Sequence, residues 1–351
     1  MTPRCALVEL NECHGETLAT FVRLAEEAGF HVDVFMRRRV AEMDPFPEGT
    51  RVPDAVHVLE RLETRIRRRA LGFRGYELVV ANSVEPVAAL DALGAVRRPM
   101  AGVVHNGVVL ERDARFTRFF AEERRAPVAL GRHVATSISS GEAPWIAPVE
   151  LGPPGDASVV PDRFVVQGSV DLARRDYLGL VEALEQLGEE ESSSFRVELV
   201  GGAHGVDGLR LARRMDRSPA GARIDWEDRR VDYDSFLRRI AAAGFILPLV
   251  EPRQATMRAY FEDKITSSVS MAIGLARIPV LHHRLAALYG LGEIGVTHGD
   301  GALADGMRAA LALTQAERRR RVEALLALRE SLLERSSQVF SALVERVLPG
   351  R

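Results

Sequence analysis

The sequence of 351 residues is almost without lysine, because Lys264 is the only lysine among its 47 basic residues. It has two cysteines, Cys5 and Cys13, whose spacing matches neither a zinc site nor a disulfide framework, so we expect a reducing compartment, the cytoplasm. The formal net charge is −2. The chain therefore lacks the basic excess with which general nucleic-acid-binding proteins neutralise phosphates, and we expect no nucleic-acid partner.

Long hydrophobic runs are also missing. The longest covers residues 241–250 and is broken by Gly244 and Pro248, whereas a membrane span needs about 20 apolar residues. The N-terminus lacks the features of a secretory signal. The 46% hydrophobic and 27% charged residues are typical of a soluble globular protein, and at roughly 150 residues per domain the length predicts two domains.

Short runs rich in Val and Ile alternate with amphipathic stretches along the whole chain. In the first half we expect strands at 5–10, 31–36, 77–81 and 100–105, and helices at 16–28, 54–71 and 84–93. In the second half we expect strands at 164–166, 195–200, 222–226, 245–250 and 278–281, and helices at 176–187, 205–215, 233–243, 266–275, 302–313 and 315–347. This alternation predicts parallel sheets with helices on both faces.

Residues 152–162 carry Pro153, Pro154, Gly155 and Pro161 and are the best linker candidate. We therefore predict an N-terminal domain over 1–155, a C-terminal domain over 162–335 and a last helix over 336–351. The fold class is α/β, with two doubly wound Rossmann-like domains. Ligands of such sheets bind at the carboxyl ends of the strands, and with two facing domains we expect the site in the cleft between them.

Two turns in the second half are typical of anion binding. Gly201 and Gly202 follow a strand and open a helix, where backbone amides and the helix N-terminus favour negative charge. Taken alone, glycines that serve packing explain this turn equally well. Another strand ends at Gly168, and Arg174 and Arg175 stand just before the next helix, where a guanidinium would suit a diphosphate. The alternative is a pair of exposed arginines.

The segment around Lys264 carries the clearest pattern. Thr266, Ser267 and Ser268 follow it at the expected start of a helix. One of these hydroxyls is expected to cap the helix, but three in a row exceed what capping needs, and free amides with hydroxyls form an anion site. The lysine adds a compact charge that the broad guanidinium of arginine does not replace. We therefore favour a phosphate contact over a chance survivor.

Together these features resemble the donor-binding domain of GT-B glycosyltransferases, near the large retaining family 4. The resemblance covers about residues 162–315 and, in the first half, the architecture alone. It rests on the order and spacing of several degenerate motifs, which are Gly168 with Arg175, Leu199-Val200-Gly201-Gly202, the helix headed by Asp234, Ile246-Leu247-Pro248-Leu249, Lys264-Ile265-Thr266-Ser267-Ser268, and Ile278-Pro279-Val280 after a helix containing Gly274.

The resemblance implies a nucleoside-diphosphate sugar as co-substrate, bound mainly by the C-terminal domain. Arg175 and Lys264 would face the diphosphate, Ser267 and Ser268 would meet phosphate or ribose, and the last helix would cross back to the first domain. The second of two glutamates that the family often carries falls near Ala272, where this sequence has no carboxylate. That departure leaves the stereochemical outcome open.

An acceptor hydroxyl loses a proton as it attacks the sugar, and a strand-end histidine would take it. His105 ends one expected strand and resembles a strand-end histidine of related transferases, and His14 follows the first strand as the second choice. Each, taken singly, is more often a solvated loop residue. We expect no metal ion and no cofactor, because capping by Asp234 explains Asp232-Tyr233-Asp234 better than metal binding does.

The sequence therefore predicts a metal-independent glycosyltransferase of the cytoplasm, acting on a small molecule, a glycan or a lipid-linked saccharide. A homodimer is compatible with it. One alternative is a nucleotide-sugar epimerase of the same fold, which would need carboxylates in the cleft, with Glu12, Glu85 and Glu251 as candidates. The other is a non-catalytic protein that binds a sugar or a nucleotide.

Overall fold

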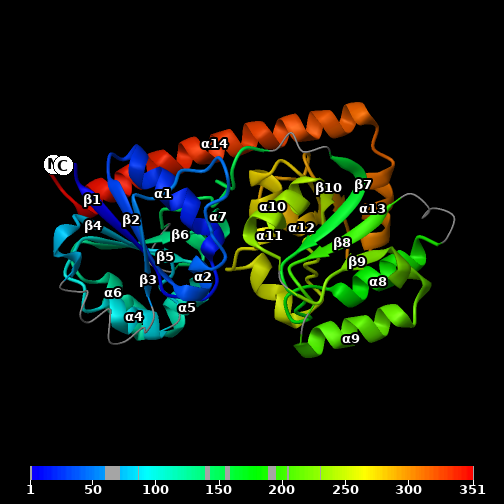
Figure 1. Cartoon of the computed structure of the whole chain (residues 1–351), viewed down its shortest axis with the longest axis horizontal. Coiled ribbons are helices and arrows are strands. Elements are labelled where there is room, and N and C mark those ends of the chain that lie inside the picture. Colours follow the sequence, from blue (N-terminus) through cyan, green and yellow to red (C-terminus); the bar gives the residue numbers. More distant parts are fainter. Residues whose placement is uncertain are drawn as a thin grey trace. The chain divides into compact units, whose positions relative to one another are not determined.

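The computed structural model of the chain describes residues 2–59, 72–85, 87–138, 143–154, 159–188, 195–203, 205–229 and 231–350. The chain divides into two compact units. Unit 1 comprises Met1–Gly152, Glu262–Ile265 and Glu330–Arg351, and unit 2 comprises Pro153–Phe261 and Thr266–Arg329. Each unit is built on its own parallel sheet with helices along it (Figure 1).

The sheet of unit 1 has the strand order β3-β2-β1-β4-β5-β6, and all of its pairs are parallel. The strands are β1 (Arg4–Glu9), β2 (His31–Arg37), β3 (Ala55–Leu59), β4 (Leu78–Ala81), β5 (Met100–Val104) and β6 (Arg125–Ala129). Along the chain, the order changes direction between β1 and β4. Open α/β sheets bind their ligands outside the carboxyl ends of the strands at such a point.

Alternate residues of β1 enter different apolar clusters, as expected for a sheet covered on both faces. Ala6 and Val8 belong to one cluster. Cys5 and Leu7 belong to the other, with residues of helix α1 (Leu18–Glu27) and of the end of α14 (Gln315–Val347). Phe340 of α14 is fully buried there, and burying one such side chain contributes about 1.5–3 kcal/mol. The last residues of the chain are therefore held by the core of unit 1.

The sheet of unit 2 has the order β12-β11-β10-β7-β8-β9, and its pairs are also parallel. The strands are β7 (Val160–Gln167), β8 (Arg196–Val200), β9 (Ile224–Trp226), β10 (Ala243–Ile246), β11 (Ile278–His282) and β12 (Val296–His298). The order changes direction between β7 and β10. The two sheets thus share one topology, and each has its expected ligand position at the end of its first strand.

Short helices connect the strands. In unit 1, besides α1, they are α2 (Arg38–Ala41), α4 (Val87–Leu93), α5 (Gly107–Arg112), α6 (Ala114–Phe120) and α7 (Arg132–Thr136). In unit 2 they are α8 (Tyr177–Gln186), α9 (Gly205–Asp216), α10 (Tyr233–Ala241), α11 (Ser267–Gly274), α12 (His283–Leu288) and α13 (Leu303–Leu311). None of the described helices has both the length and the apolar character that crossing a membrane requires.

The predicted helix over 54–71 is wrong in its first part, because Ala55–Leu59 forms the edge strand β3. Val56 and Val58 of this strand are exposed, and their neighbours are more buried. This two-residue alternation is the pattern of a half-covered strand, and the pairing with β2 decides it over helix propensity. Residues 60–71 lie outside the described residues, as does Gly155 of the predicted linker.

Candidate active site

Buried polar side chains gather at the carboxyl ends of three strands of unit 1. Glu9 is the last residue of β1, Asn82 and Ser83 follow β4, and His105 follows β5. His105 is 6% exposed and the other three are fully buried. We call these four residues the strand-end cluster. It lies where the strand order changes direction, which is the position expected for a ligand.

Hydrogen bonds join the strand-end cluster. Ser83 Oγ lies 2.9 Å from Glu9 Oε2 and 3.2 Å from His105 Nε2. The side-chain amide of Asn82 donates to the same oxygen of Glu9, and the backbone N–H of Asn11 donates to Glu9 Oε1 over 2.6 Å. When Glu9 is ionised its carboxylate only accepts hydrogen bonds, so the Ser83 hydroxyl then donates to Glu9.

His105 has its two ring nitrogens in different surroundings. Nε2 lies 2.8 Å from the backbone oxygen of Asn82, and since a carbonyl oxygen only accepts, Nε2 carries the proton. Nδ1 is then unprotonated, and it is buried with no hydrogen-bond partner among the described residues. Burial, followed by the charges of His14 and Lys264, holds the pKa of His105 well below its usual value. His105 thus offers the free lone pair that a general base requires.

The structure brings the two predicted histidines together. The ring centroids of His14 and His105 are 3.9 Å apart, and the backbone of His14 is left-handed with a φ of 72°. Burial by itself lowers the pKa of His14, but hydrogen bonds with Cys13 and Glu16 outweigh burial and raise that pKa well above its usual value. A positively charged imidazole therefore lies against the neutral one, which favours the neutral form of His105.

Glu85 borders the same strand ends. Its Oε1 accepts hydrogen bonds from the backbone N–H groups of His105 and Asn106, each over 3.1 Å. Its Oε2 is buried and has no hydrogen-bond partner in the described part of the chain. Burial raises the pKa of this carboxyl, although the two backbone donors oppose the shift. Glu85 Oε2 is thus a second hydrogen-bond acceptor without a partner among the described residues, on a side chain that contacts the backbone of His105.

Lys264 belongs to unit 1, although the sequence assigned it to the C-terminal domain. It pairs with Asn106 in an isolated antiparallel bridge. Its backbone oxygen lies 3.0 Å from His133 Nε2, and the neighbouring Ile265 packs against the apolar clusters of unit 1. The positive charge of Lys264 is close enough to lower the pKa of His105. Its contact with a diphosphate stays a prediction.

The pKa of Glu9 makes the stability of the protein depend on pH. Burial raises this pKa from 4.5 to about 7, against the charge of His14 and the hydrogen bonds from Asn11, Asn82 and Ser83. A carboxyl whose pKa is raised by folding stabilises the native state below its unfolded pKa, and this contribution is lost as the pH rises through the folded value. We expect Glu9 to lower the free energy of unfolding by up to about 3 kcal/mol between pH 4.5 and pH 7.

Urea unfolding of the wild type and of Glu9→Gln at several pH values measures this effect. The difference between the two proteins isolates Glu9 from the other titrating groups, and it should change in favour of the variant as the pH rises. Asp33→Asn is the matched control, because Asp33 is also a buried carboxylate of this sheet, 2% exposed, and it bonds Arg4 and Tyr76. A pH-independent difference for Glu9→Gln would contradict the prediction.

In unit 2, two glycines close the carboxyl ends of β7 and β8. Gly201 has a φ of 138°, and a Cβ there would lie 2.5 Å from the backbone carbon of Gly168. Gly168 has a φ of 88°, and a Cβ there would lie 3.3 Å from the Arg175 guanidinium. Both positions therefore require glycine. Gly202 also has a positive φ, and its carbonyl accepts a hydrogen bond from the backbone of Val170 over 3.1 Å.

The start of α11 meets these strand ends. Gln167, the last residue of β7, donates from Nε2 to Ser267 Oγ over 2.8 Å and to Ser268 Oγ over 3.0 Å. Arg175 lies 3.4 Å from Ser268 Oγ, and its Nε is buried without a hydrogen-bond partner among the described residues. We call Gly168, Arg175, Gly201, Ser267 and Ser268 the cradle. Guanidinium donors, hydroxyls and a helix N-terminus suit a phosphate group.

One of the three hydroxyls was expected to cap α11, and this prediction is wrong. Thr266 occupies the N-cap position, but its side chain makes no capping hydrogen bond, and its backbone N–H donates to Tyr289 Oη over 3.1 Å. The serine hydroxyls contact Gln167 and Arg175 instead. The contacts across the sheet edge, which the sequence does not reveal, decide where these hydroxyls point.

The expected cap of α10 is also shifted. Asp232, and not Asp234, caps this helix by accepting a hydrogen bond from the backbone of Ser235 over 2.8 Å. Asp234 lies in the first turn and pairs with Arg238. Within the described residues, no three or more His, Cys, Asp or Glu side chains are grouped so that they could hold a metal ion.

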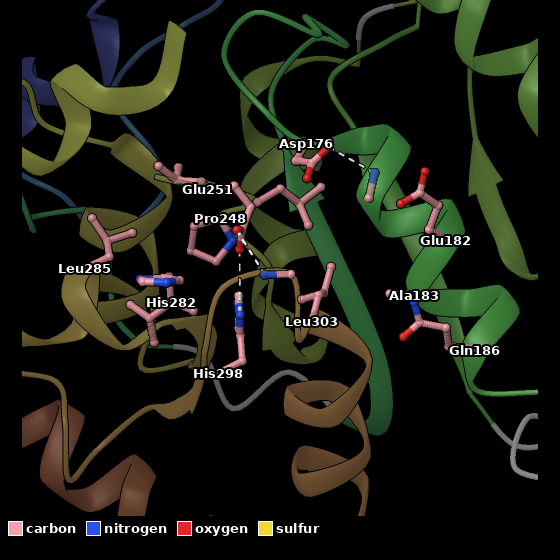
Figure 2. Close-up of a pocket in the computed structure, with 15 residues that line it drawn as sticks. Asp176, Glu182, Ala183, Gln186, Pro248, Glu251, His282, Leu285, His298 and Leu303 are labelled. Atoms are coloured by element: carbon pink, nitrogen blue, oxygen red, sulfur yellow. Dashed lines mark hydrogen bonds and ion pairs between the residues drawn. The ribbon is translucent and has the colours of Figure 1, made fainter. Parts of the chain in front are cut away.

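A cavity of about 80 Å³ lies in unit 2 beside α8, the end of β11, α12 and the segments that follow β10 and β12 (Figure 2). Glu251 lines it, with Oε2 3.3 Å from the backbone N–H of Gly301 and Oε1 3.8 Å from His298 Nδ1. Burial raises the pKa of Glu251, and the nearby carboxylates of Asp176 and Asp300 add to the shift. This carboxyl therefore offers a hydrogen-bonding group to a small ligand.

The three carboxylates of the epimerase alternative are not gathered in one unit. Glu85 belongs to unit 1 and Glu251 to unit 2. Glu12 is half exposed and pairs with Arg37 and Arg39. Of the three, only Glu85 adjoins the strand-end cluster.

Sequence reasoning missed Glu9, Asn82, Ser83 and Gln167. Glu9 was taken as part of an apolar run, but a single charged residue at the end of a buried strand is itself a signal. Asn82, Ser83 and Gln167 are polar residues at strand ends, where α/β ligands bind. Their hydrogen bonds join residues far apart in the sequence, so the residue types alone do not reveal them.

No protein-family model matches this sequence, and no curated protein does either. Solved structures do match. HepE from Anabaena in complex with UDP-glucose has a TM-score of 0.65 at 13% identity and covers 97% of this chain and 99% of its own. An α,α-trehalose-phosphate synthase (UDP-forming) from Burkholderia vietnamiensis has a TM-score of 0.60 at 13% identity, with the same coverage.

An α-glucosyltransferase solved with UDP and a DNA 13-mer has a TM-score of 0.55 at 10% identity and covers 97% of this chain and 95% of its own. At these identities the likeness concerns the fold. The matches span nearly the whole chain, and they agree with the two six-stranded parallel sheets of the structure. The chain therefore has the fold of the GT-B glycosyltransferases.

Proposed function

We propose that this protein is a glycosyltransferase that moves a sugar from a nucleoside-diphosphate donor to an acceptor hydroxyl. The observation that carries the proposal is the cradle at the ends of β7 and β8. There, glycines that leave no room for a side chain bring two strand ends into contact beside a guanidinium with a buried, unused donor. In a fold shared with enzymes solved with UDP or UDP-glucose, a diphosphate suits this place.

The donor is held by unit 2 in this proposal. Arg175 donates to the diphosphate, and the hydroxyls of Ser267 and Ser268 supply further hydrogen bonds at the N-terminus of α11. The charge on the leaving diphosphate is met by these donors and by the helix dipole, and we expect no metal ion and no cofactor. The similar structures include a UDP-forming enzyme and complexes with UDP-glucose and UDP, so UDP is the first nucleotide to test.

The acceptor hydroxyl is activated by unit 1. Its oxygen forms a new bond to the anomeric carbon of the sugar, and the bond from that carbon to the diphosphate oxygen breaks, so that the electron pair leaves with the nucleoside diphosphate. The proton of the hydroxyl passes to His105 Nδ1, the buried nitrogen without a partner among the described residues. The low pKa of His105 keeps this nitrogen unprotonated at neutral pH.

A thermal-shift panel of UDP, GDP, ADP and dTDP tests the donor. A ligand that binds only the folded protein raises its melting temperature, and a concentration 100 times Kd adds about 2.7 kcal/mol of stability. We expect one of these nucleotides to stabilise the protein, also in the presence of EDTA. Failure of all four would contradict the proposed donor class.

Incubation with the matching nucleotide sugars then separates the alternatives. A glycosyltransferase releases nucleoside diphosphate faster when an acceptor is added. Conversion of the nucleotide sugar to free epimerised sugar without an acceptor would favour the epimerase. Tight binding without turnover of any donor would favour a binding protein.

A further inference from the structure

Glu9 has no route of its own to a substrate, because it is fully buried and its oxygens are occupied by the backbone of Asn11 and the side chains of Asn82 and Ser83. A buried carboxylate is costly unless it is well paired. Every one of its side-chain partners, however, lies next to His105 in the strand-end cluster. Glu9 is therefore connected to His105 through the hydrogen bonds of Asn82 and Ser83. This connection points to a role in addition to packing.

The direction of the Ser83 proton is the central point. Ser83 has one O–H, and above pH 7, where Glu9 is ionised, it donates this proton to the Glu9 carboxylate 2.9 Å away. The lone pairs of Ser83 Oγ are then left for His105 Nε2, 3.2 Å away. The Asn82 carbonyl, 2.8 Å from the same nitrogen, also only accepts. Nε2 therefore faces two acceptors, and it must carry the proton of the ring.

We infer that Glu9 is a positioning residue that sets the tautomer of His105 through Ser83, with the ring proton on Nε2 and the lone pair on Nδ1. The inference rests on the proposed function only in one respect, namely that the proton which Nδ1 accepts comes from the acceptor hydroxyl. When the carboxylate is absent, the Ser83 hydroxyl is free to turn and donate to Nε2. The ring proton then moves to Nδ1, and this nitrogen can no longer take the proton of the acceptor hydroxyl.

His14 supports the same state of the ring. It lies 3.9 Å from His105 between ring centroids, and its charge disfavours a second proton on His105. The charged and titratable groups around the cluster are Cys13, His14, Glu16, Glu85 and Lys264. Ser83 contacts a carboxylate oxygen of Glu9.

The test is nitrogen NMR of the full-length protein labelled with ¹⁵N-histidine, in which His105 is assigned by the signal missing from His105→Ala. The chemical shifts of the two ring nitrogens report which one carries the proton. In the wild type, measured above pH 7 so that Glu9 is ionised, we expect the Nε2–H tautomer. In Glu9→Met, which offers the Ser83 hydroxyl no carboxylate to donate to, we expect a mixture with the Nδ1–H form and a turnover lower on the order of tenfold.

Two further variants separate positioning from packing. Ser83→Ala alone should keep the Nε2–H tautomer through the Asn82 carbonyl, and adding Glu9→Met to it should no longer change the tautomer, since the path through Ser83 is gone. Asp33→Asn removes another buried carboxylate of the same sheet, one that bonds Tyr76 and Arg4. It should leave the His105 signals unchanged.

An Nδ1–H tautomer in the wild type overturns the inference, and this measurement does not depend on the folding of any variant except the one used for assignment. An unchanged tautomer in Glu9→Met overturns it as well. If the tautomer shifts as expected but no nucleotide sugar is turned over by the wild type, the inference stands and the proposed function fails. The two ideas are therefore tested separately.

Discussion

Replacing His105 with alanine is expected to lower turnover about 100- to 10,000-fold, the usual contribution of a positioned general base. The dissociation constant of the nucleoside diphosphate should not change, because His105 belongs to unit 1 and the cradle to unit 2. The physical reason is the buried Nδ1, whose lone pair has no partner among the described residues. Steady-state kinetics and calorimetry on the same preparation measure the two effects.

His57→Ala is the matched control for this variant. His57 belongs to the same sheet, on the edge strand β3, and stacks on Phe35 with ring centroids 4.5 Å apart. Its removal also deletes an imidazole from unit 1, but it should leave turnover nearly unchanged. Full activity of His105→Ala would remove His105 from the mechanism. Partial recovery of activity with added imidazole would support its role as a base.

Replacing Arg175 with methionine is expected to weaken binding of the nucleoside diphosphate about 10- to 100-fold. Hydrogen bonds to charged groups contribute about 1.5–3 kcal/mol each, which corresponds to a change of this size in Kd. Methionine keeps much of the apolar stem, so the variant tests the guanidinium. Isothermal titration calorimetry with UDP and GDP measures the change.

Arg174→Met controls for the loss of a positive charge next to the cradle. The Arg174 side chain is 63% exposed and pairs with Asp171, and surface ion pairs contribute little. We expect the Kd of the nucleoside diphosphate for Arg174→Met to stay within about twofold of the wild-type value. Equal weakening by both variants would indicate a general electrostatic effect. An unchanged Kd in Arg175→Met would place the diphosphate elsewhere.

Much of the fold was predictable because local patterns determine it. The apolar face of residues 18–25 predicts α1, and Gly29, with a φ of 80°, ends it as expected. The alternation of strands and helices predicts two parallel sheets, which the structure confirms. The helix expected over 54–71 failed at β3, because pairing with β2 overrides local propensity at a sheet edge.

The candidate site was predictable in part, residue by residue. His105 and Gly168 stand out because they follow buried strands, and Arg175 because it precedes a helix. Glu9 was not predicted, because its importance lies in contacts with Asn82 and Ser83, more than 70 positions away. The resemblance to family 4 in particular still rests on the sequence motifs alone.

The sequence by itself determined the α/β class, the two sheets and the positions at which ligands of such sheets bind, because hydrophobic periodicity and glycine positions are local properties. The tertiary structure alone decided that Lys264 packs with unit 1, beside His133, where its charge lowers the pKa of His105. It also decided that Ser83 contacts both Glu9 and His105. Both outcomes depend on which strand ends become neighbours, and strand order is a property of the whole sheet.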